Sequence, residues 1–138
     1  MKHTITRAWA LMPALAMMYL TSTGSAHAQS TALKANIPFA FYVGDQKLPP
    51  GEYRLTQPMN GVLSISGDEG SAKILSTAAD NRDGKTMLVF SKYGTDQLFL
   101  SEVRWRDSTR RLLQSRLELE LAKKPITPER VIATGTIR

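Results

Sequence analysis

The densest group of side chains suited to ligand binding is a cluster of arginines near the end of the chain. Arg104, Arg106, Arg110 and Arg111 are its centre, and Arg116 follows. Arg104 and Arg106 alternate onto one face of a predicted strand, and Arg110 and Arg111 come in the next loop. Guanidinium groups bind phosphate and carboxylate groups through paired hydrogen bonds. The cluster is therefore a candidate anion-binding site, although a solvated face partly neutralised by nearby acids is the more common origin of this pattern.

A loop rich in acids offers a second chemistry. Asp80, Asn81 and Asp83, with Asp96 further along, carry the oxygen ligands that Ca²⁺ prefers. The loop lacks the length and the closing glutamate of an EF-hand, and Asp, Asn and Gly are ordinary residues of turns. We predict no metal site and no cofactor.

Histidine and cysteine are missing where catalysis would need them. The chain has no cysteine, and both histidines, His3 and His27, fall within the predicted signal peptide. This excludes His-dependent nucleophilic catalysis, ordinary zinc sites and disulfides from the mature chain. A glycoside hydrolase would need two acids about 5 to 10 Å apart across a cleft. Glu102, Asp107 and Asp96 are candidates, but nothing in the sequence places them together. We predict no catalytic residues and no enzymatic activity.

The first 28 residues have the regions of a secretory signal peptide: a basic start, an apolar run from Ala8 to Leu20, and an Ala-His-Ala cleavage site. The apolar run holds 13 residues, whereas a membrane-spanning helix needs about 20. We predict cleavage between Ala28 and Gln29, a mature chain without a transmembrane segment, and a periplasmic or extracellular location.

Cleavage changes the charge balance. It would leave 110 of the 138 residues, with 16 Lys and Arg against 12 Asp and Glu, a formal net charge of +4. A chain of that length can bury the core of one domain without disulfides.

Short alternating runs recur about every ten residues, which is typical of an all-β fold. The predicted strands cover residues 32–43, 52–57, 62–66, 72–78, 86–93 and 98–106. Pro38 makes the first strand an edge or a bent strand, and Asn60-Gly61 predicts a type I′ hairpin. The run "MLVF" predicts a central strand, and Phe99 and Val103 are expected to share an inward face. We predict a small antiparallel β-sandwich, or a barrel, of six or seven strands.

The most patterned segment is "NIPFAFYVGDQKLPPGEYRL", residues 36–55. Its Pro-Pro-Gly presets the backbone for a turn, and the residues on either side alternate in polarity. Phe39, Phe41 and Tyr53 then point inward, which favours a structural corner over an aromatic binding surface.

Residues 115–124 fit either a strand or a helix. They alternate as a strand would, yet Ser115 and Glu118 match a capping box, and Leu117 and Leu121 lie four apart. Good helix formers favour a short C-terminal helix. The predicted organisation is a signal peptide over 1–28, one β domain over 29–121, and the end of the helix with a flexible tail over 122–138.

Three segments together resemble a family of small exported bacterial proteins without an established function. They are "NIPFAFYVGDQKLPPGEYRL", "LVFSKYGTDQLFLSEVRW" and "QSRLELELAKK". The resemblance runs from about Ala35 to Lys124 and implies a small β domain ending in a short helix, with no catalytic residues. More loosely, "LPPGEY" is similar to a corner in transthyretin-like and immunoglobulin-like accessory domains.

These observations predict an exported, non-enzymatic β domain that binds a protein or another component of the cell envelope. An alternative is a module that binds anionic glycan or lipid headgroups through Arg104, Arg106, Arg110 and Arg111. A carboxylate-based hydrolase is a remote alternative. Nucleic acid is not expected as a partner, since the chain has no recognised binding motif.

Overall fold

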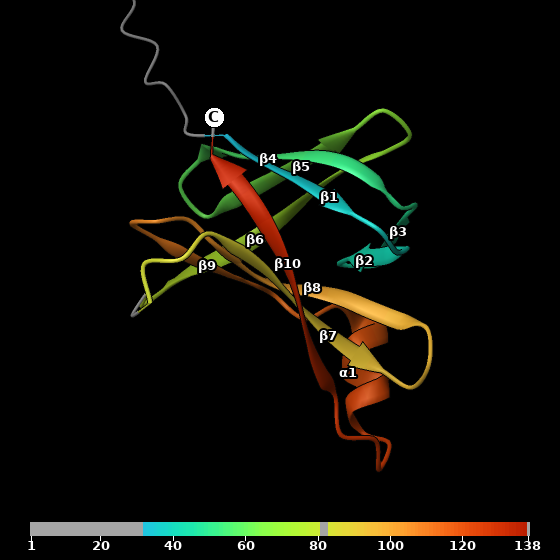
Figure 1. Cartoon of the computed structure of the whole chain (residues 1–138). Coiled ribbons are helices and arrows are strands. Elements are labelled where there is room, and N and C mark those ends of the chain that lie inside the picture. The colour runs from blue at the N-terminus through green and yellow to red at the C-terminus, as the bar shows by residue number, and fades with distance from the viewer. Residues whose placement is uncertain (1–31, 81–82, 138) are drawn as a thin grey trace, which may run out of the picture.

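A computed structural model describes residues 32–80 and 83–137 (Figure 1). The predicted signal peptide, the cleavage site between Ala28 and Gln29, and Asn81 of the acidic loop lie outside these residues. Export stays a prediction. Within the described ranges, no helix is long and apolar enough to cross a membrane.

The described residues form ten strands and one short helix. In chain order these are β1 (Leu33–Ile37), β2 (Phe41–Val43), β3 (Gln46–Leu48), β4 (Gly51–Met59), β5 (Val62–Gly67), β6 (Ser71–Ala79), β7 (Met87–Tyr93), β8 (Gln97–Arg104), β9 (Thr109–Leu112), α1 (Arg116–Ala122) and β10 (Glu129–Ile137).

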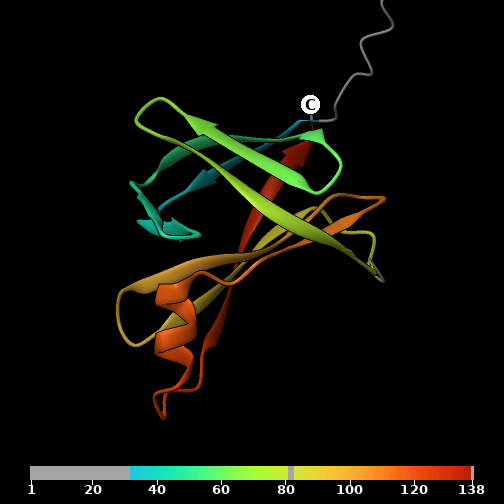
Figure 2. The ribbon, with the colours of Figure 1, turned by 180° about the vertical axis from the view of Figure 1, so that it is seen from behind.

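Eight strands close into an antiparallel barrel. Around the ring the order is β8, β7, β10, β1, β4, β5, β6 and β9, and the pairing of β9 with β8 completes the circle. β2 and β3 form an extra hairpin, which joins the wall through one parallel pair, Tyr42 opposite Phe99. In both ribbon views this hairpin lies at one end, between the layer of β1 and β4 and the layer of β7 and β8 (Figures 1 and 2).

The mostly β fold with a short helix is confirmed. The number of strands was predicted too low, and of the sandwich and the barrel it is the barrel that forms. The predicted strand over 32–43 divides at Pro38 into β1 and β2, and the further strands β3, β9 and β10 lie in segments predicted as turn, loop or tail.

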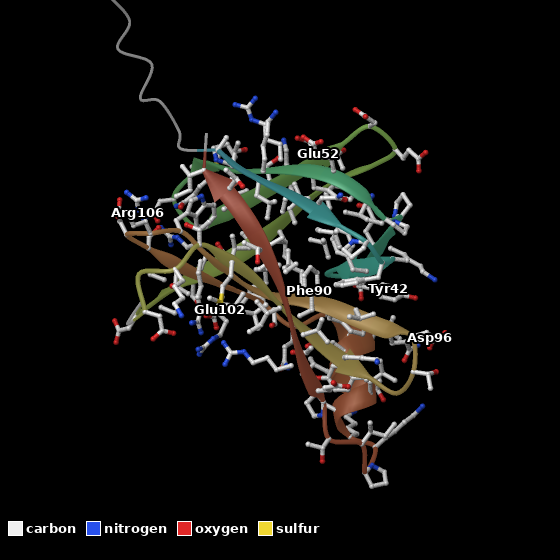
Figure 3. All side chains as sticks on the ribbon, in the orientation of Figure 1. Tyr42, Glu52, Phe90, Asp96, Glu102 and Arg106 are labelled. Atoms are coloured by element: carbon white, nitrogen blue, oxygen red, sulfur yellow. The ribbon has the colours of Figure 1, made fainter. Side chains whose placement is uncertain are left out.

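Side chains fill the barrel interior. Phe41 makes edge contacts with Phe90 and Tyr53, with ring centroids 5.5 and 5.1 Å apart, and Phe90 lies between the two layers (Figure 3). The largest fully buried side chains are Phe41, Phe90, Phe99, Leu33, Ile37, Leu48, Leu55, Leu63, Ile65, Leu88, Val103 and Thr109. An eight-stranded barrel is just wide enough for such side chains to occupy its interior, so the interior is core.

The Pro-Pro-Gly segment is the predicted corner. It joins β3 to β4, and the buried Tyr53 donates a hydrogen bond from its hydroxyl to the carbonyl oxygen of Pro49, 2.5 Å away. Pro38 likewise ends β1 and separates it from β2. The prediction of a bend at Pro38 is confirmed, but β1 is no edge strand, because β4 and β10 flank it.

The hairpin predicted at Asn60-Gly61 is present, and Met59 pairs with Val62 across it. Its predicted turn type is wrong. Among the described residues only glycines have positive φ, so Gly61 at +81° is left-handed and Asn60 is not. A type I′ turn would require both.

A bulge in β8 changes which side chains face inward. Val89 pairs with Glu102, whereas the next residue, Phe90, pairs with Leu100, so the register shifts by one residue. Phe99 therefore faces out of the barrel while Val103 faces in, and the prediction that they share a face is wrong. A one-residue shift exchanges the two faces of a strand.

The segment predicted as the end of the helix and a flexible tail, residues 122–138, contains a barrel strand. β10 pairs with β7 on one side and with β1 on the other, so the β domain extends to Ile137. Ala133 and Gly135 face the interior beside larger neighbours, and small residues there weaken the alternation by which the sequence would reveal a strand.

The helix predicted within residues 115–124 is confirmed as α1. Ser115 is its N-cap, and the Ser115 Oγ accepts a hydrogen bond from the Glu118 backbone N–H at 3.1 Å. In both ribbon views α1 lies beside β7 and β8, on the side away from β4 and β5 (Figures 1 and 2).

Candidate functional site

Two of the candidate arginines share an acidic partner on the outer wall. Arg104 Nε lies 2.5 Å from Glu102 Oε1, and its Nη1 lies 3.0 Å from Asp83 Oδ2. Arg111 pairs with Glu102 in the register of β8 and β9, and its Nη2 is 3.8 Å from Glu102 Oε2. The Glu102 hydrogen bond is the main cause of the raised pKa of Arg104. Glu102 and Asp83 thus largely neutralise Arg104, whereas Arg111 is 67% exposed at its side chain.

The other two candidate arginines lie elsewhere. Arg110 donates from Nε to Gln57 Oε1 and from Nη2 to Asn60 Oδ1, both at 3.2 Å. These contacts connect β9 to the hairpin of β4 and β5. Arg106 lies in the turn after β8, at the far end of the barrel from Asp96 (Figure 3). Arg110 and Arg111 are consecutive residues of β9 and therefore point to opposite faces, so the four arginines do not share one face of the wall.

The candidate carboxylates are also dispersed. Glu102 and Asp83 hold arginines, and Asp96 is in the turn between β7 and β8, well apart from Glu102 in Figure 3. Among residues 32–80 and 83–137, no group of three or more His, Cys, Asp or Glu is placed to hold a metal ion.

A small aromatic cluster outside the barrel encloses a carboxyl group. Tyr93, Phe99 and Leu121 are buried there, and Tyr42 stacks on Phe99 with ring centroids 4.8 Å apart. Glu118 of α1 is only 5% exposed and accepts a hydrogen bond from the Tyr93 hydroxyl at 3.4 Å. Burial raises the pKa of Glu118, against smaller opposing effects of hydrogen bonds from Tyr93 and Gln114. Its position between helix and wall indicates a role in docking α1.

Two shallow depressions lie on the outer wall over β1 and β4, with volumes of about 360 and 430 Å³. Lys34 and Glu52 line both, and their charged groups are 3.9 Å apart. Exposed polar side chains make up most of the remaining lining, and no buried, unpaired polar group points into either depression.

An apolar row runs from the β4–β5 hairpin across β6 to the residue after β9. Met59 pairs with Val62, and Val62 pairs with Leu75. The β6–β9 register continues to Leu113, whose backbone N–H donates to the Leu75 carbonyl at 3.2 Å. Residues paired across a ladder project to the same face, so these four side chains form one outward-facing group, called the apolar row below.

The apolar row is exposed. Met59, Leu75 and Leu113 keep 64%, 59% and 50% of their surface open to solvent, and Val62 is partly buried. Single exposed leucines are common on protein surfaces, whereas contiguous apolar groups mark interaction sites. The sequence does not reveal the row, because its members are up to 54 positions apart and only the strand register brings them together.

Basic side chains lie beside the apolar row. Lys73 is two residues before Leu75 on β6, and Arg111 is two residues before Leu113, so each lies on the same outer face as its leucine. The outward positions of β5 and β6 otherwise carry Ser, Thr and Ala and no acidic residue.

Comparisons with protein-family models, with curated proteins and with solved structures found no match. The resemblance to a family of small exported proteins therefore stays a hypothesis, and the function is argued from the surface itself.

Proposed function

We propose that this chain is an exported binding module of the cell envelope, acts without catalysis, and uses the outer wall of its barrel. The apolar row carries the proposal. Met59, Leu75 and Leu113 are each at least half exposed and lie side by side on paired strands, and a contiguous exposed apolar group is the usual mark of an interaction surface.

The fold supports an external site over an internal one. Aromatic and aliphatic side chains occupy the barrel interior, so a ligand would have to displace core. On the outer wall, Glu102 is paired with Arg104, and Asp96 lies well apart from Glu102 (Figure 3). A barrel with a packed interior and an exposed apolar row on its wall is suited to binding a partner at its surface.

The arginine cluster is a weaker basis for function. Arg104 and Arg110 already have hydrogen-bond partners within the protein, and Arg111 shares Glu102 with Arg104. Anionic glycan binding through Arg104 and Arg110 would require these close contacts to break, so we prefer the apolar row.

Site-specific photo-crosslinking in living cells tests the proposal. A photoreactive residue replaces Leu75 in the full-length chain, and a matched one replaces Ile132, which is also exposed but lies on β10. We expect crosslinks to an envelope component from position 75 and few from position 132. Equal crosslinking from both positions, or none, would contradict a binding role for the row. An intact mass that retains residues 1–28 would contradict export.

A further inference from the structure

We infer that the apolar row, together with Lys73 and Arg111, docks the barrel onto an anionic lipid surface. This inference rests on the proposed function and specifies the partner of the binding module as an anionic lipid surface. Apolar side chains would enter the boundary between headgroups and acyl chains, and the cationic groups would meet lipid phosphates, as in proteins that bind the membrane interface.

The charges beside the row favour an anionic partner. Lys73 and Arg111 lie on the outer face next to Leu75 and Leu113. Arg111 is 67% exposed at its side chain, and its ion pair with Glu102 is long at 3.8 Å. Lys73 and Arg111 therefore place positive charge on both sides of the apolar row.

The same arrangement disfavours a second copy of this chain. Lys73 and Arg111 belong to different strands, β6 and β9, on the face that carries the row. Two copies packed face to face through their rows would bring cationic groups together around a small apolar contact. Like charges placed opposite one another weaken association, so a self-complementary dimer is not the expected occupant.

An added peptide strand is also disfavoured. β4, β5, β6 and β9 each have paired strands on both sides within the closed ring. None of them offers the free edge that strand addition requires. A partner must therefore contact side chains on the outside of a barrel wall, and a fluid lipid surface can adapt to that shape.

Vesicle co-sedimentation of the full chain tests the inference. The probes are vesicles of phosphatidylcholine alone and of phosphatidylcholine mixed with phosphatidylglycerol. We expect binding to the anionic vesicles, weaker binding to the neutral ones, and loss of binding as salt rises. Leu75→Ser and Lys73→Glu should each weaken binding to the anionic vesicles by about tenfold or more.

Two control variants distinguish the loss of this surface from a general loss of exposed apolar area or of positive charge. Ile132→Ser removes an exposed apolar side chain from β10, and Lys124→Glu changes the net charge as Lys73→Glu does, at the exposed position after α1. Both should bind as the unchanged protein does. Circular dichroism of each variant verifies that the barrel is folded.

The outcomes distinguish this inference from the proposed function. Absence of binding to anionic vesicles, or equal losses in Lys73→Glu and Lys124→Glu, would overturn the lipid inference. If position 75 nevertheless crosslinks to a protein in cells, the binding module stands with a protein partner. If neither vesicle binding nor crosslinking occurs, both proposals fall.

Discussion

The Tyr93 hydroxyl donates a hydrogen bond to Glu118 Oε1 across 3.4 Å, and this contact joins β7 to α1 outside the barrel. Tyr93 and Glu118 are both buried. Burial favours the neutral form of each group, and the neighbouring carboxylate also raises the pKa of Tyr93. The helix is thus held to the wall by apolar packing around a carboxyl group that is costly to ionise.

The stability of the fold should depend on the charge of Glu118. Its pKa in the folded protein is raised above the ordinary value of 4.5, so the folded state binds a proton more tightly than the unfolded state does. This group therefore lowers stability at pH above its folded pKa, and the penalty disappears as pH falls below 4.5. Glu118→Gln should raise the melting temperature at neutral pH. It should also weaken the dependence of the melting temperature on pH above 4.5.

Thermal unfolding followed by circular dichroism over a pH series measures this effect. Glu120→Gln is the control, because Glu120 is exposed and pairs with Lys123 at the surface. An unchanged pH profile in Glu118→Gln would show that the carboxyl group does not act as described.

The N-cap of α1 should contribute measurably to stability. Ser115 is buried, and its Oγ accepts a hydrogen bond from the Glu118 N–H. Ser115→Ala should lower the free energy of unfolding by about 1 kcal/mol, the usual effect of losing a cap. Urea unfolding gives the value. Ser115→Thr keeps a hydroxyl and should retain most of the stability; a similar loss in both variants would point to packing instead of the cap.

The local signals in the sequence predicted the parts of the fold that depend on near neighbours. The cap residues Ser115 and Glu118 begin α1, Pro38 ends β1, and Gly61 provides the positive φ of its hairpin. Each of these features depends on a few adjacent residues, because backbone conformation at Pro, Gly and caps is set locally.

Features that depend on distant partners were not predictable in this way. Phe99 faces α1 because a bulge shifts β8 against β7, and the sequence of β8 alone carries no mark of it. Likewise, Leu75 and Leu113 meet only through the pairing of β6 and β9. The candidate surface follows from strand register, which one sequence does not specify.

The arginine network on β8 should stabilise the wall more than a surface ion pair does. The side chains of Glu102 and Arg104 are only 12% and 15% exposed. Glu102→Ala would leave Arg104 without its main partner and should cost about 1.5–3 kcal/mol, as expected for a hydrogen bond between charged groups. Denaturant unfolding measures the loss. Glu120→Ala breaks an exposed pair and should cost at most about 0.5 kcal/mol; equal costs would mean that the Glu102 network is only a surface feature.

The packing of Gly135 against Leu33 should distinguish a barrel strand from a flexible tail. A Cβ at Gly135 would lie 2.9 Å from Leu33 Cδ1, and Leu33 is fully buried. Gly135→Ala should therefore cost about 1–3 kcal/mol through overpacking, whereas Thr136→Ala, on the exposed face of β10, should cost little. Adding Leu33→Ala should relieve the clash, so the double variant should lose less than the sum of the single losses. Urea unfolding of the unchanged protein and of these four variants tests this, and a Gly135→Ala variant of unchanged stability would favour the flexible tail that the sequence predicted.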